Sequence, residues 1–358
     1  MRTMSLDIKI EKTAAPKKKP NQNSLGFGKY FTDHMFMMDY KEGVGWHDAR
    51  IVPYGPLSLE PSAMVFHYSQ CTFEGLKAYS GPQGEVLLFR PEQNIRRMNI
   101  SNERLCIPTI DEDDFMSALK MLVNTDKDWI PDEDGTSLYI RPFVIATEAA
   151  VGVHPSYEYY FMIILSPVGA YYPEGVNPVK IFVEDEYVRA VKGGIGFAKT
   201  GGNYAASIKS QQKAQALGYT QVLWLDGVTR RNIEEVGTMN VFFKIDGKII
   251  TPVLEGSILP GVTRDSCIEL LKSWGYEIFE RVITIDELKT AHEEGKLEEA
   301  FGTGTAAVIS PIGEISFEGS QMLINDFVTG PVSQKLYDTL YRIQTGVMDD
   351  PYGWSMKI

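Results

Sequence analysis

The chain has 358 residues, enough for about two domains of ordinary size, each with its own hydrophobic core. Its hydrophobic content of 44%, charged content of 23% and mean hydropathy of −0.16 are typical of a soluble globular protein. A net charge of −12 argues against nucleic acid or a membrane surface as a partner, because both require a basic face.

Cysteine and histidine usage limits the compartment and the metal chemistry. Cys71, Cys106 and Cys267 are far apart and form no CxxC pair, which favours a reducing, cytoplasmic location over a disulfide framework. The five histidines lack metal-ligand spacing, so we expect no metal site. No apolar run approaches the roughly 20 residues of a membrane-spanning helix, and the N-terminus lacks a signal-like apolar core.

The first part of the chain predicts a tail and a small domain. Residues 1–24 mix lysine, proline and asparagine without periodicity, which predicts a mobile N-terminal tail. Residues 25–168 predict a smaller N-terminal α/β domain with helices starting near Pro91 and Asp111. Its predicted strands are FGKYFTDHMFMMDY, MVFHYS, GLKAYS, EVLLFR, SLYIRPFVIAT and YYFMIILSPVG.

A Gly- and Pro-rich stretch separates this part from the rest. Residues 169–178, GAYYPEGVNP, lack periodicity and predict an interdomain linker. Residues 179–358 predict a larger C-terminal α/β domain, and no internal repeat is visible. Its predicted strands include KIFVEDEYV, TQVLWLDG, the hairpin NVFFKIDGKIITP and AAVISPIGEISF, and its helices include YAASIKSQQKAQALG, GVTRDSCIELLKSWG, IDELKTAHEEG and residues 325–346.

The segment GGIGFAKTGGNYAASIKSQQ is the first candidate for chemistry. Glycines on both sides of Lys199 let the backbone approach a ligand closely. A partly desolvated lysine amine is nucleophilic and can form a Schiff base with a carbonyl. A flexible glycine loop with an exposed lysine remains the alternative for this segment alone.

Further along, three segments favour an anionic ligand. Arg90 ends an apolar strand before a helix and could grip a phosphate, although by itself a surface arginine at a strand end is the simpler interpretation. In LPGVTR a Pro-Gly turn brings Val262 and Thr263 to the start of a helix, where free N–H groups attract an anion. FGTGTA is a second glycine-threonine turn, although by itself it could be an ordinary β-turn.

A carboxylate pair precedes a predicted strand in RRNIEEVGTMNVFF. Most such pairs are solvated. A buried carboxylate could instead pair with the protonated ring nitrogen of a pyridine cofactor, which then withdraws electrons.

In this order, these motifs resemble the branched-chain aminotransferases, a family of fold-type IV pyridoxal-phosphate (PLP) enzymes whose architecture is shared with D-amino-acid aminotransferases and aminodeoxychorismate lyase. The resemblance runs from about residue 25 almost to the C-terminus and implies two mixed α/β domains and a homodimer. Its strongest stretches are FHYSQCTFEGLKAY, FRPEQNIRRM, YIRPFVIAT, PVGAYYPEG, AKTGGNYAAS, QVLWLDG, EVGTMNVF, LPGVTR and FGTGTA.

The resemblance implies a cofactor role for particular residues. Lys199, rather than Lys209, would be covalently attached to PLP and would act as the general base. Tyr204 would hydrogen-bond the cofactor's phenolic oxygen, and Glu235 would pair with the cofactor's ring nitrogen. The residues expected to hold or lie near the phosphate are Arg90, Val262, Thr263, Thr305 and Thr238.

It also implies a substrate site. Tyr139 and Arg141 would meet carboxylates, and the Thr305–Ala306 turn would bind the α-carboxylate through its N–H groups. The expected walls of the aliphatic pocket are Tyr68, Phe73, Val153 and Tyr171, with Tyr68 and Val153 able to reach a neighbouring subunit's site.

The implied reaction is ping-pong transamination of leucine, isoleucine or valine with 2-oxoglutarate. A D-amino-acid aminotransferase or lyase on the same scaffold, and a non-catalytic protein that binds a phosphate ligand, are the alternatives. Mammalian members carry a CxxC pair after the GTGTA-like turn, whereas this chain reads AAVISP there, so we expect no thiol switch at that place.

Overall fold

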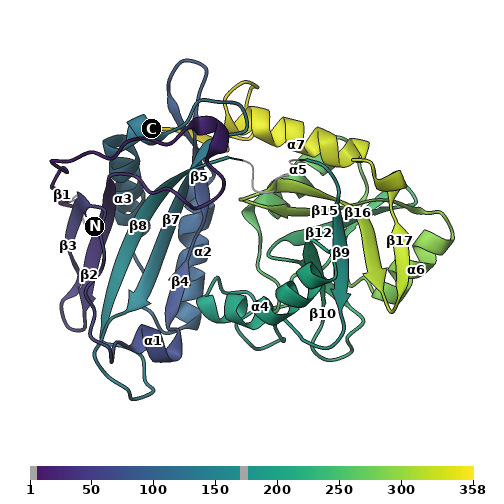
Figure 1. Cartoon of the computed structure of the whole chain (residues 1–358), viewed down its shortest axis with the longest axis horizontal. Helices are drawn as coiled ribbons and strands as arrows, with labels where there is room; N and C mark the ends of the chain where they lie inside the picture. The colour runs from purple at the N-terminus through teal and green to yellow at the C-terminus, as the bar shows by residue number, and fades with distance from the viewer. Residues whose placement is uncertain (1–5, 170–175) are drawn as a thin grey trace. The chain divides into compact units, whose positions relative to one another are not determined.

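The computed structural model describes residues 6–169 and 176–358. They form two compact units, each built from helices and one large β-sheet (Figure 1). The first unit comprises residues up to 171 together with 198–201 and 342–358, and the second comprises 172–197 and 202–341. The mixed α/β class predicted from the sequence is confirmed.

The first unit's sheet contains nine strands among the described residues, in the order β1-β3-β2-β8-β7-β5-β6-β18, with β4 also paired to β7. Neighbours are antiparallel except for the parallel pair β1 and β3. The strands are β1 (Lys9–Ile10), β2 (His34–Lys41), β3 (Gly45–Pro53), β4 (Cys71–Phe73), β5 (Leu76–Ser80), β6 (Val86–Phe89), β7 (Ser137–Ala146), β8 (Glu158–Val168) and β18 (Ser355–Lys357).

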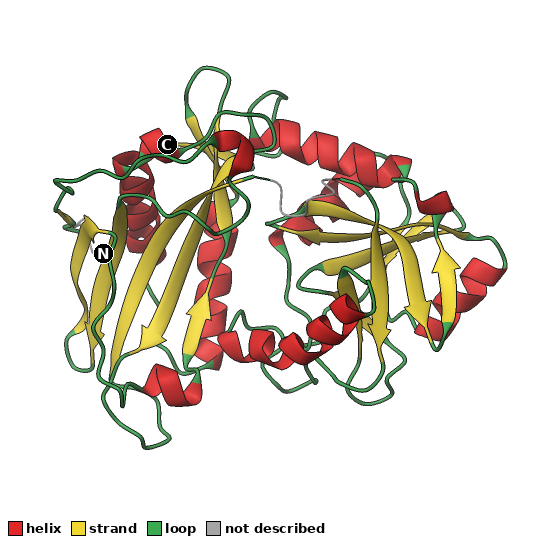
Figure 2. Ribbon diagram, viewed as in Figure 1, coloured by secondary structure: helices red, strands yellow, loops and turns green. Residues whose placement is uncertain are grey.

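Two longer helices cover one face of this sheet and bury its core (Figure 2). Pro91 supplies the preset φ of a first helical turn, and Asp111 caps the next helix by accepting the N–H groups of Asp113 and Asp114. Phe115 packs edge-on against Phe161 of the sheet. The helices are α1 (Met64–Tyr68), α2 (Pro91–Arg104) and α3 (Glu112–Thr125), with short 3₁₀ turns at Gln22–Ser24 and Lys127–Trp129.

The prediction of a strand at MVFHYS was wrong, because these residues form helix α1. In a strand, Met64, Phe66 and Tyr68 would share one face. Met64 is instead buried while Phe66 is 62% exposed, and Ser69 ends the helix in a left-handed conformation with its N–H bonded to the carbonyl of Val65.

Part of the segment predicted to be a mobile tail, residues 9–17, contacts the rest of the first unit. Strand β1 pairs with β3 at the edge of the sheet. The N–H of Thr13 donates to Nε2 of His34 (2.9 Å), and that of Lys17 donates to Asp33 (2.8 Å). The polar backbone therefore gains partners on the first unit, which composition alone does not reveal.

The division into units differs from the predicted domains in one respect that matters for function. Residues 198–201 group with the first unit rather than with the C-terminal part. The last residues join it as well, because β18 pairs with β6. The boundary at 171/172 lies inside the predicted linker, of which residues 170–175 are outside the described part of the chain.

The second unit's sheet also has nine strands within the described ranges, in the order β11-β10-β9-β16-β15-β12-β13-β14, with β17 paired to β16. It is mixed, since β9 runs parallel to both β10 and β16. The strands are β9 (Val179–Glu184), β10 (Gln221–Leu225), β11 (Ile233–Val236), β12 (Asn240–Ile245), β13 (Lys248–Thr251), β14 (Ile278–Glu280), β15 (Leu297–Gly304), β16 (Val308–Phe317) and β17 (Ser320–Leu323).

Helices complete the second unit around buried aromatic residues. Phe242 and Phe301 stack with ring centres 5.3 Å apart, and Trp224 packs with Ala214 of α4. The helices are α4 (Gly201–Ala216), α5 (Val262–Ser273), α6 (Ile285–Glu293) and α7 (Pro331–Gln344), with a 3₁₀ turn at Asn325–Phe327. Across the described residues, no helix is both long and apolar enough to span a membrane.

Candidate functional site

Lys199 lies beside strand β4 in the first unit. The N–H of Phe73 donates to the carbonyl of Lys199 (3.0 Å), and the N–H of Lys199 donates to Oγ of Ser101 (2.9 Å). Thr72 and Thr200 form an isolated bridge next to these bonds. The backbone of Lys199 is therefore fixed, while its half-buried side chain places Nζ 5.1 Å from the centre of the Phe73 ring.

The same ring contacts Arg141 of β7. The guanidinium carbon lies 4.7 Å from the centre of the Phe73 ring, and Arg141 donates to the hydroxyl of Tyr139 (3.0 Å). Nε of Arg141 is buried and has no hydrogen-bond partner among the described residues. Because a guanidinium matches a carboxylate with two parallel donors, this buried donor fits a carboxylate ligand.

Gly75 makes this cluster possible by its lack of a side chain. A Cβ atom there would lie 2.1 Å from the hydroxyl oxygen of Tyr139 and 2.9 Å from its ring. Gly75→Ala is therefore expected to displace Tyr139 and to lower the free energy of unfolding by about 2 kcal/mol, as overpacking does. Urea unfolding measures this loss.

Gly55→Ala is the control for Gly75→Ala, because the nearest atom to a Cβ at Gly55 is 4.0 Å away. Adding Tyr139→Phe to Gly75→Ala removes the closest clashing atom and should recover part of the loss. Equal stability of Gly75→Ala and Gly55→Ala would contradict the close packing of Tyr139.

Arg90 stands at the start of helix α2. It occupies the N-cap position in a left-handed conformation (φ 48°), and its N–H donates to the carbonyl of Trp354 (2.8 Å). Its guanidinium carbon lies 5.2 Å from the centre of the Trp354 ring. A cation at a helix N-terminus, where the dipole also favours negative charge, fits an anion such as phosphate.

Two predicted pocket residues, Tyr68 and Val153, are not brought to Lys199 by the described contacts. Tyr68 is partly exposed on α1 and donates its hydroxyl to the carbonyl of Val151. Val153 is 86% exposed. Tyr171 lies outside the described residues.

In the second unit, Glu235 is a buried carboxylate on β11 with two partners. Its Oε1 accepts the N–H of Leu259 (2.9 Å), and its Oε2 lies 3.2 Å from Nε of Arg189. Arg189 is itself buried and donates to the carbonyl of Ser257. An ion pair with further hydrogen bonds is the arrangement that a buried charge requires.

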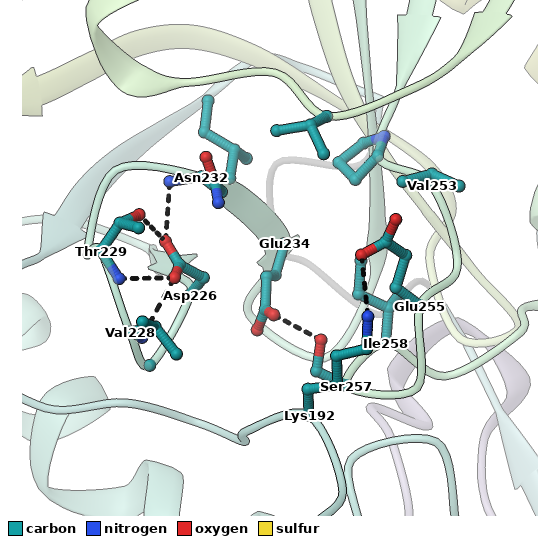
Figure 3. A pocket seen from close by; sticks show the side chains of 14 residues that line it. Lys192, Asp226, Val228, Thr229, Asn232, Glu234, Val253, Glu255, Ser257 and Ile258 are labelled. Carbon is teal, nitrogen blue, oxygen red and sulfur yellow. Dashed lines mark hydrogen bonds and ion pairs between the residues drawn. The ribbon is translucent and has the colours of Figure 1, made fainter.

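Glu234 precedes Glu235 and, since strand residues alternate, points to the other side of β11. It lines a pocket of about 230 Å³ in the second unit together with Asp226 and Ser257 (Figure 3). Ser257 donates its hydroxyl to Glu234, and burial raises the pKa of the Glu234 carboxyl. The two carboxylates thus have different surroundings, and Glu235 is the one that bonds Leu259 of the LPGVTR turn.

Leu259 connects Glu235 to the start of α5. Its carbonyl accepts a hydrogen bond from Nδ2 of Asn240 (3.0 Å). The same amide packs closely against Gly261, where a Cβ atom would lie 2.1 Å from Oδ1 of Asn240. Gly261 is the N-cap of α5 and has no side chain to cap it, so the helix start at Val262 suits an anion. Leu259 thus fixes the Glu235 carboxylate near the start of α5. The carboxylate fits the ring nitrogen of the implied cofactor, and the helix start fits its phosphate.

The remaining predicted residues of the second unit lie in α4 and in two turns. Tyr204 is half-buried in the first turn of α4. Thr238 is exposed in the turn between β11 and β12. Thr305 and Ala306 form the half-buried turn between β15 and β16.

The sequence analysis missed several residues that hold the predicted ones. Arg189 pairs with Glu235, and Ser101 accepts the N–H of Lys199. Glu74 and Arg97 form a buried ion pair directly after Phe73. Glu74 and Arg97 stand within quoted motifs, so for these two residues membership of a motif was the available signal. In the described part of the chain, no three His, Cys, Asp or Glu side chains are grouped to hold a metal ion.

Comparisons with known proteins show the family of the chain. A family model described as amino-transferase class IV matches residues 72–315. The chain is 59% identical to branched-chain-amino-acid aminotransferase 2 of Bacillus subtilis (strain 168), over 98% of this chain and 97% of that protein. It is 56% identical to a probable branched-chain-amino-acid aminotransferase of Staphylococcus aureus (strain N315), over 99% of both.

Solved structures show the same similarity. The branched-chain amino acid aminotransferase of Escherichia coli superimposes with a TM-score of 0.76 at 27% identity, covering 90% of this chain and 98% of that one. The T.th. branched-chain amino acid aminotransferase with pyridoxamine 5'-phosphate superimposes with a TM-score of 0.74 at 27% identity, covering 89% and 97%.

Proposed function

Because the chain belongs to the class IV aminotransferase family, we propose that it transfers amino groups between branched-chain amino acids and 2-oxoglutarate with PLP as cofactor. The products are branched-chain 2-oxo acids and L-glutamate. The observation that carries this proposal is the Phe73 ring, which contacts both the amine of Lys199 and the guanidinium of Arg141. One aromatic wall thus adjoins a nucleophilic amine and a carboxylate-binding group.

In the first unit, Lys199 attaches the cofactor and moves the proton. Its Nζ would hold PLP covalently, and the same amine would take the α-hydrogen of the substrate as a proton. Arg141 and Tyr139 bind the distal carboxylate of glutamate, and Arg90 binds the phosphate. The fixed backbone of Lys199 limits the positions that its amine can reach.

In the second unit, Glu235 holds a proton at the cofactor's ring nitrogen. PLP, when bound, supplies an aldehyde carbon that can accept the amino nitrogen and a ring that withdraws electrons from the substrate's α-carbon. The phosphate is held by the start of α5 at Val262 and Thr263 and by Thr305, with Thr238 nearby. Tyr204 donates to the phenolic oxygen.

Both substrates use one site in alternating half-reactions. Phe73 and Tyr171 contribute apolar walls for an aliphatic side chain, with Tyr68 and Val153 reaching the site of a neighbouring copy. The Thr305–Ala306 turn binds the α-carboxylate through its N–H groups. The protein forms a homodimer, which would cover exposed apolar side chains of the first unit. It works in the cytoplasm, where cysteines stay reduced, in keeping with its free cysteines.

A panel of amino donors tests this function. The purified protein with PLP and 2-oxoglutarate is expected to form L-glutamate from L-leucine, L-isoleucine and L-valine, and none with D-alanine as donor. Chromatography of the product distinguishes L- from D-glutamate. Activity with D-alanine alone would move the protein to the D-amino-acid branch, which the named relatives do not favour.

Arg141→Leu is expected to separate the two substrates. Losing a charged hydrogen-bond donor to the distal carboxylate should lower kcat/KM for 2-oxoglutarate by about 10- to 100-fold. The value for L-leucine, which has no second carboxylate, should change far less. Single-turnover kinetics of each half-reaction measure both values. Arg50→Leu, which removes the partner of Asp39 elsewhere in the sheet, is the control. Equal losses for both substrates would contradict this role of Arg141.

A further inference from the structure

Glu74 is a fully buried carboxylate with an unusually complete set of partners. It has no exposed surface, and it follows Phe73 directly in the chain. Nε and a terminal nitrogen of Arg97 donate to its two oxygens (2.7 and 2.8 Å). Nδ2 of Asn94 and the N–H of Gly75 add two more bonds (2.9 and 3.1 Å). Such a charge is retained only where its partners compensate for the loss of water.

The partners of Glu74 stand on one face of helix α2, which also carries Arg90 at its start. Asn94, Arg97 and Ser101 recur at intervals of three and four residues, which places them in one row along α2, and Arg90 is the N-cap residue just before the helix. Ser101 donates its hydroxyl to the carbonyl of Arg97 (3.0 Å) and accepts the N–H of Lys199 (2.9 Å). Helix α2 therefore extends from Arg90, the proposed phosphate-binding residue, to Ser101, which bonds the backbone of Lys199.

Glu74 also holds the segment that flanks Lys199 on its other side. Its own N–H donates to the carbonyl of Pro142 in β7 (2.8 Å), which fixes the end of β4. The preceding residue, Phe73, donates its N–H to the carbonyl of Lys199. Lys199 is thus bonded at its N–H by α2 and at its carbonyl by β4, and the Glu74–Arg97 pair joins these two elements.

We propose that Glu74, anchored by Arg97, is a positioning residue for Lys199: it fixes β4 and α2 on either side of the lysine and supplies a buried negative charge that favours a proton on the lysine nitrogen. This inference rests on the proposed role of Lys199 as the cofactor-bearing lysine. Neither Glu74 nor Arg97 needs to touch the substrate for this effect.

Electrostatics agree with the geometry. Burial alone would raise the pKa of Glu74, but the Arg97 guanidinium and, after it, Lys199 and Asn94 hold that pKa below its usual range. Glu74 is therefore ionised, and its carboxylate attracts the side chain of Lys199. Other charged or titratable groups of the first unit stand near this segment. Arg141 contacts the same Phe73 ring as Lys199, and the Cys71 thiol lies beside Gly201. Burial raises the pKa of that thiol, so it stays neutral.

The test is a pH titration of the PLP-loaded protein, in which the visible absorption band reports the proton on the nitrogen that joins Lys199 to the cofactor. Glu74→Gln keeps the shape and removes the charge. Its midpoint is expected to fall by about one pH unit, the usual effect of losing a nearby opposite charge. The double variant Glu74→Gln/Arg97→Gln also removes the opposing positive charge. Its midpoint should therefore lie between that of the wild type and that of Glu74→Gln.

Arg96→Gln is the matched control, because Arg96 neighbours Arg97 on α2 but is exposed and pairs with exposed Glu112. Its midpoint should equal that of the wild type. A purely structural role would lower the melting temperature of Glu74→Gln without moving its midpoint, and an unchanged or raised midpoint in folded Glu74→Gln would overturn the proposal.

If Glu74→Gln does not fold, the double variant decides, since it leaves no unpaired buried charge. A midpoint below that of the wild type supports the proposal, and one at or above it overturns the proposal. A wild-type protein that shows no band from a lysine-bound cofactor would instead contradict the proposed role of Lys199, which separates the two failures.

Discussion

Lys199→Ala is expected to abolish transamination, with kcat falling by at least about a thousandfold. The variant loses both the amine that bonds the cofactor and the base that moves the substrate's proton. No other side chain is expected to replace it, because the backbone of Lys199 is fixed by Phe73 and Ser101 so that this amine lies beside the Phe73 ring. Steady-state kinetics with L-leucine and 2-oxoglutarate measure the loss.

The control for this prediction is Lys209→Ala on the exposed side of α4. It should retain wild-type turnover. Mass spectrometry after borohydride reduction adds a direct readout, because reduction fixes a lysine-bound cofactor covalently. The cofactor should be found on a peptide containing Lys199 in the wild type and Lys209→Ala. Labelling at Lys209, or full activity of Lys199→Ala, would refute the assignment.

Glu235→Gln should show the second-largest effect, a fall in kcat of about 100- to 1000-fold, the range seen when one preorganised electrostatic group is removed. A carboxylate held by Arg189 and the N–H of Leu259 can keep a proton on the ring nitrogen, whereas a neutral amide cannot. PLP binding should weaken much less than turnover. Rapid kinetics of the leucine half-reaction and a cofactor titration separate the two effects.

Glu234→Gln provides a matched control one residue away. Glu234 points to the opposite side of β11 and lines the pocket with Ser257, so its replacement should change kcat by less than about threefold. If Glu234→Gln were the more damaging variant, the assignment of the two glutamates would have to be reversed.

Several elements of the fold could be predicted from the sequence because the relevant signals are local. Gly261 marks the turn before α5, and the Asp246-Gly247 pair marks the turn between β12 and β13. Glycines around Lys199 and the order of the motifs indicate the family from the sequence alone. These features depend on residues close together in the chain, which pattern reasoning can assess.

Other features depend on contacts that pattern reasoning does not reach. MVFHYS has the composition of a strand, yet its burial follows a short helix. Helix α7 begins at Pro331 rather than at Asn325, because Asp326 adopts a left-handed conformation. The pairing of Glu74 with Arg97 joins residues 23 positions apart, and a charged pair in a sequence is usually solvated.

The most direct test of the proposed function is a single half-reaction followed by absorbance. PLP-loaded protein mixed with L-leucine, without an acceptor, should lose the visible band of the lysine-bound cofactor, and 2-oxoglutarate added afterwards should restore it. The same treatment with D-alanine should leave the band unchanged. A band that responds only to D-alanine, or that does not recover with 2-oxoglutarate, would contradict branched-chain transamination at Lys199.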